Sequence, residues 1–304
     1  MPLPTTGTTV DFPRGAVQGR ARVRHVLPSP LAPDRRLLLI TDSTPFHPLG
    51  PTPLGQPGDT GELDTAGRVV PVLDSVTVAA PPDRDIAYVG RDIPAHPAGA
   101  GWRHYVGHVV STRRGGARSG LVGARVTLRV DPRRRLLLSA GHTGHHLASL
   151  ALNAALTPYW REATVTDGLG SPDFDGLALR TYRIHPGSST STYRIGVALR
   201  ERGFDATGLD AALADIEERA NTALAAWHET GAPVLLRATG PFLDDRRVWS
   251  CALPPGRVEI PCAGTHVRGL DELERPSLRL RLDEEGTLLV CATRTIPIGF
   301  CRDP

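Results

Sequence analysis

The periodicity of the apolar residues changes near residue 130, and this change limits the folds that the chain can adopt. Before it, short apolar runs such as "RRLLLITDS" and "LVGARVTLRVD" are bounded by Gly, Pro or Asp and partly alternate with polar residues, which is typical of β-strands. After it come two stretches with helical spacing, together with further strand-like runs. The pattern predicts an α+β protein that begins with a small barrel or sandwich, and of these two we expect the barrel.

Two helices are predicted in the second half of the chain. The stretch "SAGHTGHHLASLALNAAL" places leucines among alanines and stops before Thr157 and Pro158, so we expect a helix over about 142–157. The stretch "TGLDAALADIEERANTALAAWHETG" predicts a second helix with Thr207 as its N-cap and Gly231 after its last turn. A chain of 304 residues can bury two cores. We therefore expect a β-barrel domain at 1–130 and an α+β domain at 131–304.

The charged residues indicate where a phosphate group could bind. The net charge of +3 is modest for a nucleic-acid-binding protein, and all the basic residues are arginines because the chain has no lysine. An Arg-biased genome would explain that composition. Arginine also binds phosphate in a bidentate way, and two clusters stand beside glycines or a turn. The candidate phosphate-binding residues are Arg113, Arg114, Arg118, Arg133, Arg134 and Arg135.

The chain shows no sequence signal for a membrane or for secretion. No apolar run approaches the roughly 20 residues that a membrane-spanning helix needs. The segment "MPLPTTGTTVDFPR" lacks the charged start and apolar centre of a signal peptide. We therefore expect a cytoplasmic protein without a membrane partner.

Two pairs of residues have the spacing of metal ligands. His142 and His146 are four residues apart in the first predicted helix, so their side chains leave the same face of that helix. Cys262 and His266 are also four apart, after the strand-like "GRVEI". One thiolate and three imidazoles suit Zn²⁺ in type and number. The alternative is a pair of structural histidines together with an unrelated buried thiol and a surface histidine.

Several motifs in the same order resemble the editing domain of alanyl-tRNA synthetase and its free-standing relatives, the AlaX-type deacylases. That family carries HxxxH on a helix and C-G-G-T-H-V further on, and this chain has "HTGHH" and "CAGTHV". The stretches "DSTPFHP" and "PLGQPGDTGEL" are similar to the family's D-x-T-x-F-Y-P and its glycine-rich loop. "ADIEERANTAL" looks like its I-E-x-x-x-N helix. The resemblance covers roughly residues 35–275, and it implies that the second domain is a zinc-containing editing domain.

The resemblance also implies roles for single residues. It makes Zn²⁺ the cofactor and names four ligands: His142, His146, Cys262 and His266. Gln56 matches the glutamine that lines the editing pocket, and Thr44 matches the threonine that helps to recognise a substrate hydroxyl, so these two are the expected catalytic-site and substrate-binding residues. His145 occupies a pocket position and is a candidate substrate contact or an exposed residue without a role. We interpret Asp59 as a turn residue.

The activity that the resemblance implies is hydrolysis of the ester between an amino acid and the 3′-terminal ribose of a mischarged aminoacyl-tRNA. The chain lacks the activation and tRNA-binding regions of the synthetase, which implies an enzyme that acts in trans. The family default is Ser or Gly on tRNA-Ala. The alternative is a specialised deacylase, such as one for fluorothreonyl-tRNA, because the loop "LGPTPLGQ" departs from the family pattern.

Alternatives from other classes are a zinc hydrolase of a small-molecule ester and a non-catalytic, zinc-stapled RNA-binding module. A set of four protein ligands raises a further question, because a catalytic zinc needs an open position. A loosely held His266, a five-coordinate ion, or an ion that only positions substrate would each answer it.

Overall fold

The computed structural model describes residues 2–30, 32–51, 55–95, 101–111, 120–162 and 165–300. It divides into two compact units. Unit 1 comprises Met1–Arg135, Ala238–Arg247 and Ala263–Thr265, and unit 2 comprises Leu136–Arg237, Val248–Cys262 and His266–Pro304. Two short segments from the second half of the chain therefore belong to unit 1. The prediction of two continuous domains did not include them, because nothing in their composition marks a return to the first core.

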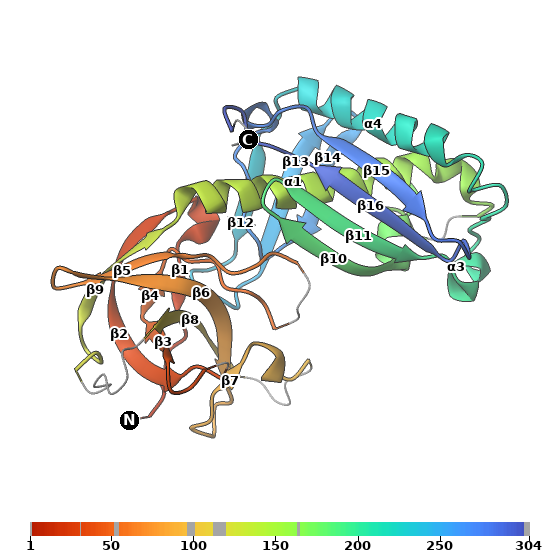
Figure 1. The fold of residues 1–304 in the computed structure, drawn as a ribbon. Helices are drawn as coiled ribbons and strands as arrows, with labels where there is room; N and C mark the ends of the chain where they lie inside the picture. Colours follow the sequence, from red (N-terminus) through yellow and green to blue (C-terminus); the bar gives the residue numbers. More distant parts are fainter. Residues whose placement is uncertain are drawn as a thin grey trace. The chain divides into compact units, whose positions relative to one another are not determined.

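Unit 1 is built on a sheet of seven strands in the order β5-β9-β2-β3-β8-β6-β7. An additional pairing of β5 with β6 closes six of these strands into a ring (Figure 1). The strands are β2 (Gln18–Pro28), β3 (Arg36–Thr41), β5 (Gly61–Thr65), β6 (Arg68–Ala80), β7 (Tyr88–Val89), β8 (Arg103–Ser111) and β9 (Arg125–Val130). Two short strands, β1 (Thr9–Val10) and β4 (Ser43–Thr44), pair in parallel.

The core of unit 1 follows from the alternation of apolar residues along its strands. In β9, Val126, Leu128 and Val130 are buried whereas Arg125 and Arg129 are exposed, as the period of two requires. The returning segment 238–247 joins this unit through backbone bonds, such as that from the Val10 N–H to the Pro241 carbonyl. The apolar runs recognised in the sequence thus fill two clusters: Leu37 and Leu39 of β3 pack with the apolar residues of β9, whereas Leu38 and Ile40 belong to a second cluster.

Unit 2 combines four α-helices of the described chain with two antiparallel sheets. The first sheet has the order β10-β11-β16-β15 and the second the order β12-β13-β14. Its helices are α1 (Pro132–Ala155, which begins in unit 1), α2 (Phe174–Ala178), α3 (Val197–Glu201) and α4 (Leu213–Glu229). Its strands are β10 (Leu179–His185), β11 (Ser188–Arg194), β12 (Val234–Ala238), β13 (Arg247–Leu253), β14 (Gly256–Pro261), β15 (Ser277–Leu282) and β16 (Leu288–Arg294).

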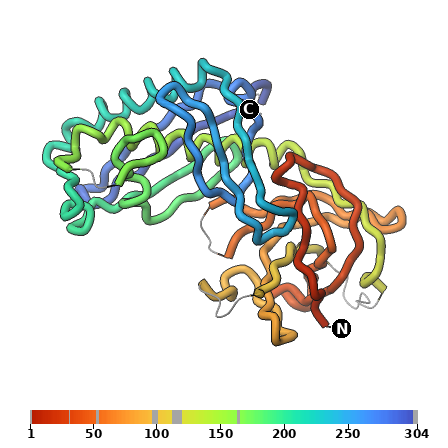
Figure 2. The backbone as a smooth tube through the Cα atoms, turned by 180° about the vertical axis from the view of Figure 1, so that it is seen from behind, coloured from red at the N-terminus to blue at the C-terminus, as the bar shows by residue number. Residues whose placement is uncertain are grey.

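The helices of unit 2 share one core with its sheets. Figure 1 shows α4 running along β15, and in Figure 2 the three strands of the second sheet run side by side in blue. Leucines and alanines of α1 and α4 are buried in the same apolar cluster as Trp249 of β13. The α+β class predicted from the sequence is confirmed.

Both predicted helices begin at other residues than expected. Helix α1 begins at Pro132, ten residues before the predicted start, because the Asp131 carboxylate accepts the N–H of Arg134 and proline is favoured at the first helical position. Helix α4 begins at Leu213, and its N-cap residue is Ala212. The prediction of Thr207 as N-cap is wrong, since the residues that follow it form turns before the helix starts.

Candidate metal centre and polar network

The two predicted ligand pairs meet in unit 2. His142 and His146 come from α1, and Cys262 and His266 come from the segment that follows β14. Among the described residues these four form a group whose ligand atoms all lie within 4.8 Å of one another. The two histidines that come from α1 are buried. The group could hold a metal ion.

The distances within the group fit coordination of one ion. The Sγ atom of Cys262 lies 3.5 Å from Nε2 of His142 and 3.2 Å from Nε2 of His266. A sulfur at ~2.3 Å and a nitrogen at ~2.05 Å from one tetrahedral ion would be about 3.5 Å apart. Nε2 of His146 is buried and has no hydrogen-bond partner among the described residues. Burial also lowers the pKa of His146 well below 6.5, so its ring is neutral and its lone pair is available to a metal.

Two neighbours orient the histidines of this group. The hydroxyl of Thr143, a fully buried residue of α1, lies 3.1 Å from Nδ1 of His266. A proton on Nδ1 donated to that hydroxyl places the lone pair of the His266 ring on Nε2, the atom that would bind a metal. The ring of Trp249 packs 5.0 Å from that of His146 and excludes water from that side. Sequence reasoning missed Thr143, although its place between the two histidine ligands was a usable signal.

His145 lies beside the group but is turned to other partners. Its ring stacks on Tyr182 of β10 at 4.6 Å with an interplanar angle of 2°, and its Nδ1 atom lies 3.2 Å from the Ser191 hydroxyl. His145 is 5% exposed, and burial lowers its pKa to about 4. His145 is therefore a buried, neutral imidazole, so the alternative of an exposed residue without a role is wrong, and the substrate contact stays a prediction.

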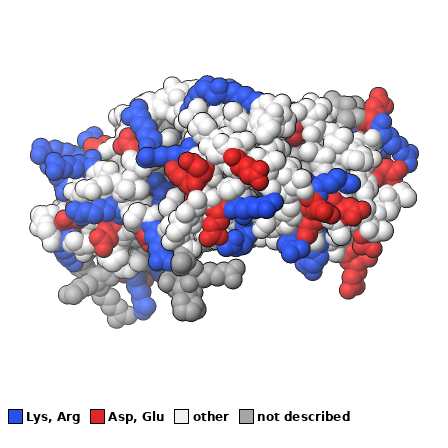
Figure 3. Space-filling model, turned by 90° about the horizontal axis from the view of Figure 1, so that it is seen from above, with Lys and Arg blue, Asp and Glu red and all other residues white. Residues whose placement is uncertain are grey.

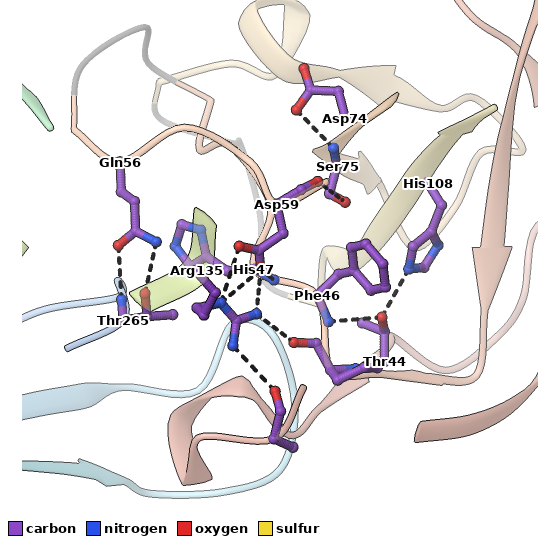
Figure 4. A network of polar contacts seen from close by, with 12 residues as sticks. Thr44, Phe46, His47, Gln56, Asp59, Asp74, Ser75, His108, Arg135 and Thr265 are labelled. Carbon is purple, nitrogen blue, oxygen red and sulfur yellow. Dashed lines mark hydrogen bonds and ion pairs between the residues drawn. The ribbon is translucent and has the colours of Figure 1, made fainter. Parts of the chain in front are cut away.

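Gln56 forms a clamp on Thr265, the residue that precedes the candidate ligand His266. In unit 1 its Nε2 atom donates to the Thr265 hydroxyl at 2.8 Å, and its Oε1 atom accepts the Thr265 N–H at 2.9 Å (Figure 4). Both side chains are buried. Thr265 is joined to the ligand His266 by a peptide bond. The expected pocket glutamine thus holds the residue next to a candidate metal ligand.

Thr44 is part of an internal network with His108. Because the Leu39 carbonyl can only accept, the proton on the His108 ring sits at Nδ1, 2.9 Å from that oxygen. Nε2 of His108 then accepts from the Thr44 hydroxyl at 2.8 Å, and that hydroxyl accepts the Phe46 N–H at 3.1 Å. Thr44 is 1% exposed. Its hydroxyl can offer a substrate only its one remaining lone pair.

The interpretation of Asp59 as a turn residue is wrong. Asp59 is fully buried, and its carboxylate forms an ion pair with the guanidinium of Arg135 (Figure 4). Nε of Arg135 lies 3.0 and 3.1 Å from the two carboxylate oxygens, and its other nitrogens donate to the carbonyls of Ala16 and Pro45. These contacts come from distant parts of the chain, so local sequence gave no sign of them.

The candidate phosphate-binding arginines, which are the expected contacts to tRNA, differ in their surroundings. Arg135 is 5% exposed, and its guanidinium nitrogens donate to groups within unit 1. It is therefore not available at the surface to bind a phosphate group. Arg133 and Arg134 lie in the first turn of α1, where Arg133 is exposed and Arg134 half-buried. The predicted cluster of Arg113, Arg114 and Arg118 lies outside the described residues. On the face drawn in Figure 3, blue arginines and red acidic residues are interspersed.

A comparison with protein-family models finds no match for this chain, and a comparison with curated protein sequences finds none either. In the part of the chain that the structure describes, every helix is too short or too polar to cross a membrane.

Proposed function

We propose that the protein is a zinc-dependent hydrolase that acts in trans on mischarged aminoacyl-tRNA. One observation carries the proposal: the "HTGHH" and "CAGTHV" motifs, which are far apart in the sequence, bring one thiol and three imidazoles within 4.8 Å of one another. These are the two motifs on which the resemblance to the alanyl-tRNA editing domain and the AlaX-type deacylases chiefly rests. We propose that the chain folds into an N-terminal β-barrel followed by a zinc-containing editing domain.

The donor set favours zinc among the common metals. Thiolate and imidazole ligands suit Zn²⁺, whereas Mg²⁺ and Ca²⁺ prefer carboxylates and carbonyl oxygens. When bound, zinc supplies a Lewis acid that polarises the carbonyl of an ester. His142, His146, Cys262 and His266 would hold the ion, and the Thr143 hydroxyl would keep the Nδ1 proton of His266 away from it.

The proposed reaction is the hydrolysis of one ester bond. Water adds to the carbonyl carbon and the bond to the ribose oxygen breaks. One proton of the water passes to the ribose oxygen, the other passes to solvent, and the amino acid leaves as a carboxylate. The stacked pair of His145 and Tyr182 lies beside the ligand group, and we propose that the half-buried Tyr182 contacts the aminoacyl group while His145 supports its ring from behind. Burial keeps His145 uncharged, so it would exert no repulsion on the substrate's ammonium group.

A panel of charged tRNAs tests the proposal. The zinc-loaded protein is mixed with Ser-, Gly-, Ala-, Thr- and fluorothreonyl-tRNA, and release of the labelled amino acid is followed over time. We expect rapid release from Ser- or Gly-tRNA-Ala, and none from correctly charged Ala-tRNA. Preference for fluorothreonyl-tRNA would identify the specialised enzyme instead. Release at the buffer rate from every member, with zinc bound, would contradict the proposal.

A further inference from the structure

One cavity of unit 1 is lined by three arginines that the proposed chemistry does not use. It has a volume of about 640 Å³, lies on the outer side of β2 and β9, and opens to solvent. Arg20 and Arg22 project from β2, and Arg125 projects from β9. All three are exposed. Their spacing follows from the period of two in "GRARVR", which directs alternate side chains to the same face.

The pairing of the strands places like charges together. Arg22 of β2 is directly opposite Arg125 of β9 in the antiparallel register. Like charges in such a pair destabilise a sheet, so an anion between them would relieve a repulsion that the fold contains. The structure shows no ion pair for Arg20 or Arg125 with any described residue, and Arg22 donates to the Gly123 carbonyl.

Each of the two carboxylates of the cavity accepts a hydrogen bond from a backbone N–H group. Asp42 accepts the N–H of Arg22 at 2.8 Å, and Asp64 accepts the N–H of Gly67 at 3.1 Å. Asp64 also lies 3.8 Å from a guanidinium nitrogen of Arg129, which does not line the cavity. Three arginines face two carboxylates in this lining, so the cavity carries one excess positive charge.

We propose that this cavity binds phosphate groups of an RNA backbone. Guanidinium groups recognise phosphate with two parallel hydrogen bonds, and an open, hollow sheet face with three of them suits a repeating anion. The inference rests on the proposed tRNA substrate: a 3′-terminal ester offers little binding surface, so affinity must come from the backbone. The cavity gives unit 1 a role in holding the tRNA.

Binding of uncharged tRNA to the zinc-loaded protein tests this without any hydrolysis. The variant carries Arg20→Gln, Arg22→Gln and Arg125→Gln. The control removes the same charge from three exposed arginines of unit 2 through Arg237→Gln, Arg257→Gln and Arg281→Gln. Each lost phosphate contact should reduce the slope of log affinity against log salt by about 0.7 to 0.9. At ~0.1 M salt, three contacts correspond to a loss on the order of 100-fold.

We expect the cavity variant to lose affinity and salt slope while the control keeps both. A second variant with lysine at the same three positions should keep the salt slope, because its charges remain, but bind more weakly. If the wild-type protein fails to bind tRNA, or if the cavity variant binds as the wild type does, the inference is overturned. Intact tRNA binding without any hydrolysis would contradict the proposed function and leave this surface supported.

Discussion

The side-chain amide of Gln56 forms two hydrogen bonds with Thr265. Replacing Gln56 should therefore change the affinity for zinc and not only the binding of substrate. We expect Gln56→Ala to weaken zinc affinity by about tenfold, the lower end of what loss of a supporting hydrogen bond costs at metal sites. Thr265→Val, which keeps the backbone N–H but loses the hydroxyl, should have a smaller effect. Competition with a chromogenic chelator measures both.

Thr265→Ser is the matched control for the clamp, because it keeps the hydroxyl and should bind zinc as the wild type does. Zinc affinity unchanged in Gln56→Ala would show that the clamp does not support the metal site. A rise in KM alone in that variant would instead assign Gln56 to the substrate.

The ion pair of Asp59 and Arg135 is buried, so removing one charge leaves the other without a partner. We expect Asp59→Asn to reduce the free energy of unfolding by about 3–5 kcal/mol. Asp64→Asn is the control in the same unit, because Asp64 and Arg129 are 3.8 Å apart and partly exposed; it should cost less than ~1 kcal/mol. Denaturant unfolding measures both, and similar costs would contradict the role given to the buried pair.

At the scale of the elements, glycines let α1 approach its neighbours. A Cβ atom on Gly141 would lie 2.5 Å from the His185 carbonyl oxygen and 2.6 Å from that of Ser188. Helix propensity alone predicts that Gly141→Ala stabilises the protein by about 1 kcal/mol. We expect the opposite, a loss of stability together with weaker zinc binding, because the backbone of the β10–β11 hairpin must move.

A control for this prediction lies in the same helix. Ala154 of α1 is exposed, so Ala154→Gly should cost about 1 kcal/mol through propensity and leave zinc binding unchanged. Thermal unfolding and zinc titration measure both variants. A more stable Gly141→Ala protein with normal zinc affinity would show that the close approach places no constraint on the helix.

Local patterns predicted what depends on local chemistry. The spacing of four in "HTGHH" and in "CAGTHV" predicted the group that could hold a metal ion, because ligands one helical turn or one loop apart can converge on one ion. The start of α1 was missed although Asp131 and Pro132 carry an N-terminal signal, since the prediction followed the apolar residues instead.

Contacts between distant residues could not be predicted in this way. The partner of Asp59 is 76 residues away, and the partner of Gln56 is 209 residues away. Neither sequence neighbourhood contains the other residue, so both side chains were assigned roles from their own positions alone. The burial of Arg135 has the same origin, because a run of three arginines gives no sign of which one turns inward.

At the scale of the whole molecule, two buried histidines of unit 1 make stability depend on pH. Burial lowers the pKa of His108 to about 4, in contact with Thr44, the Leu39 carbonyl and the ring of Phe46. The unfolded chain binds a proton at its ordinary pKa near 6.5, so it holds more protons than the folded chain between about pH 4 and 6.5. Stability therefore falls as the pH drops through this window.

His47 adds to the same dependence. Burial lowers the pKa of His47 to about 4. The charges of Arg135 and Arg247 also lower this pKa, whereas the charge of Asp59 raises it. Each histidine can contribute at most about 1.4 kcal/mol per pH unit in this window. Hydrogen exchange of β3 and β8 in the zinc-loaded protein at pH 7, 6 and 5 measures the loss. Protection that stays constant over this range would contradict the buried, neutral state of both rings.

The metal content of the purified protein tests the central claim most directly. Elemental analysis should find one zinc per wild-type chain and a clear loss in Cys262→Ser, because the hydroxyl replaces a thiolate ligand. Cys251→Ser is the matched control, since Cys251 is a buried thiol outside the ligand group, and it should keep its zinc. Absence of zinc from the wild-type protein, or equal zinc in the two variants, would contradict the account.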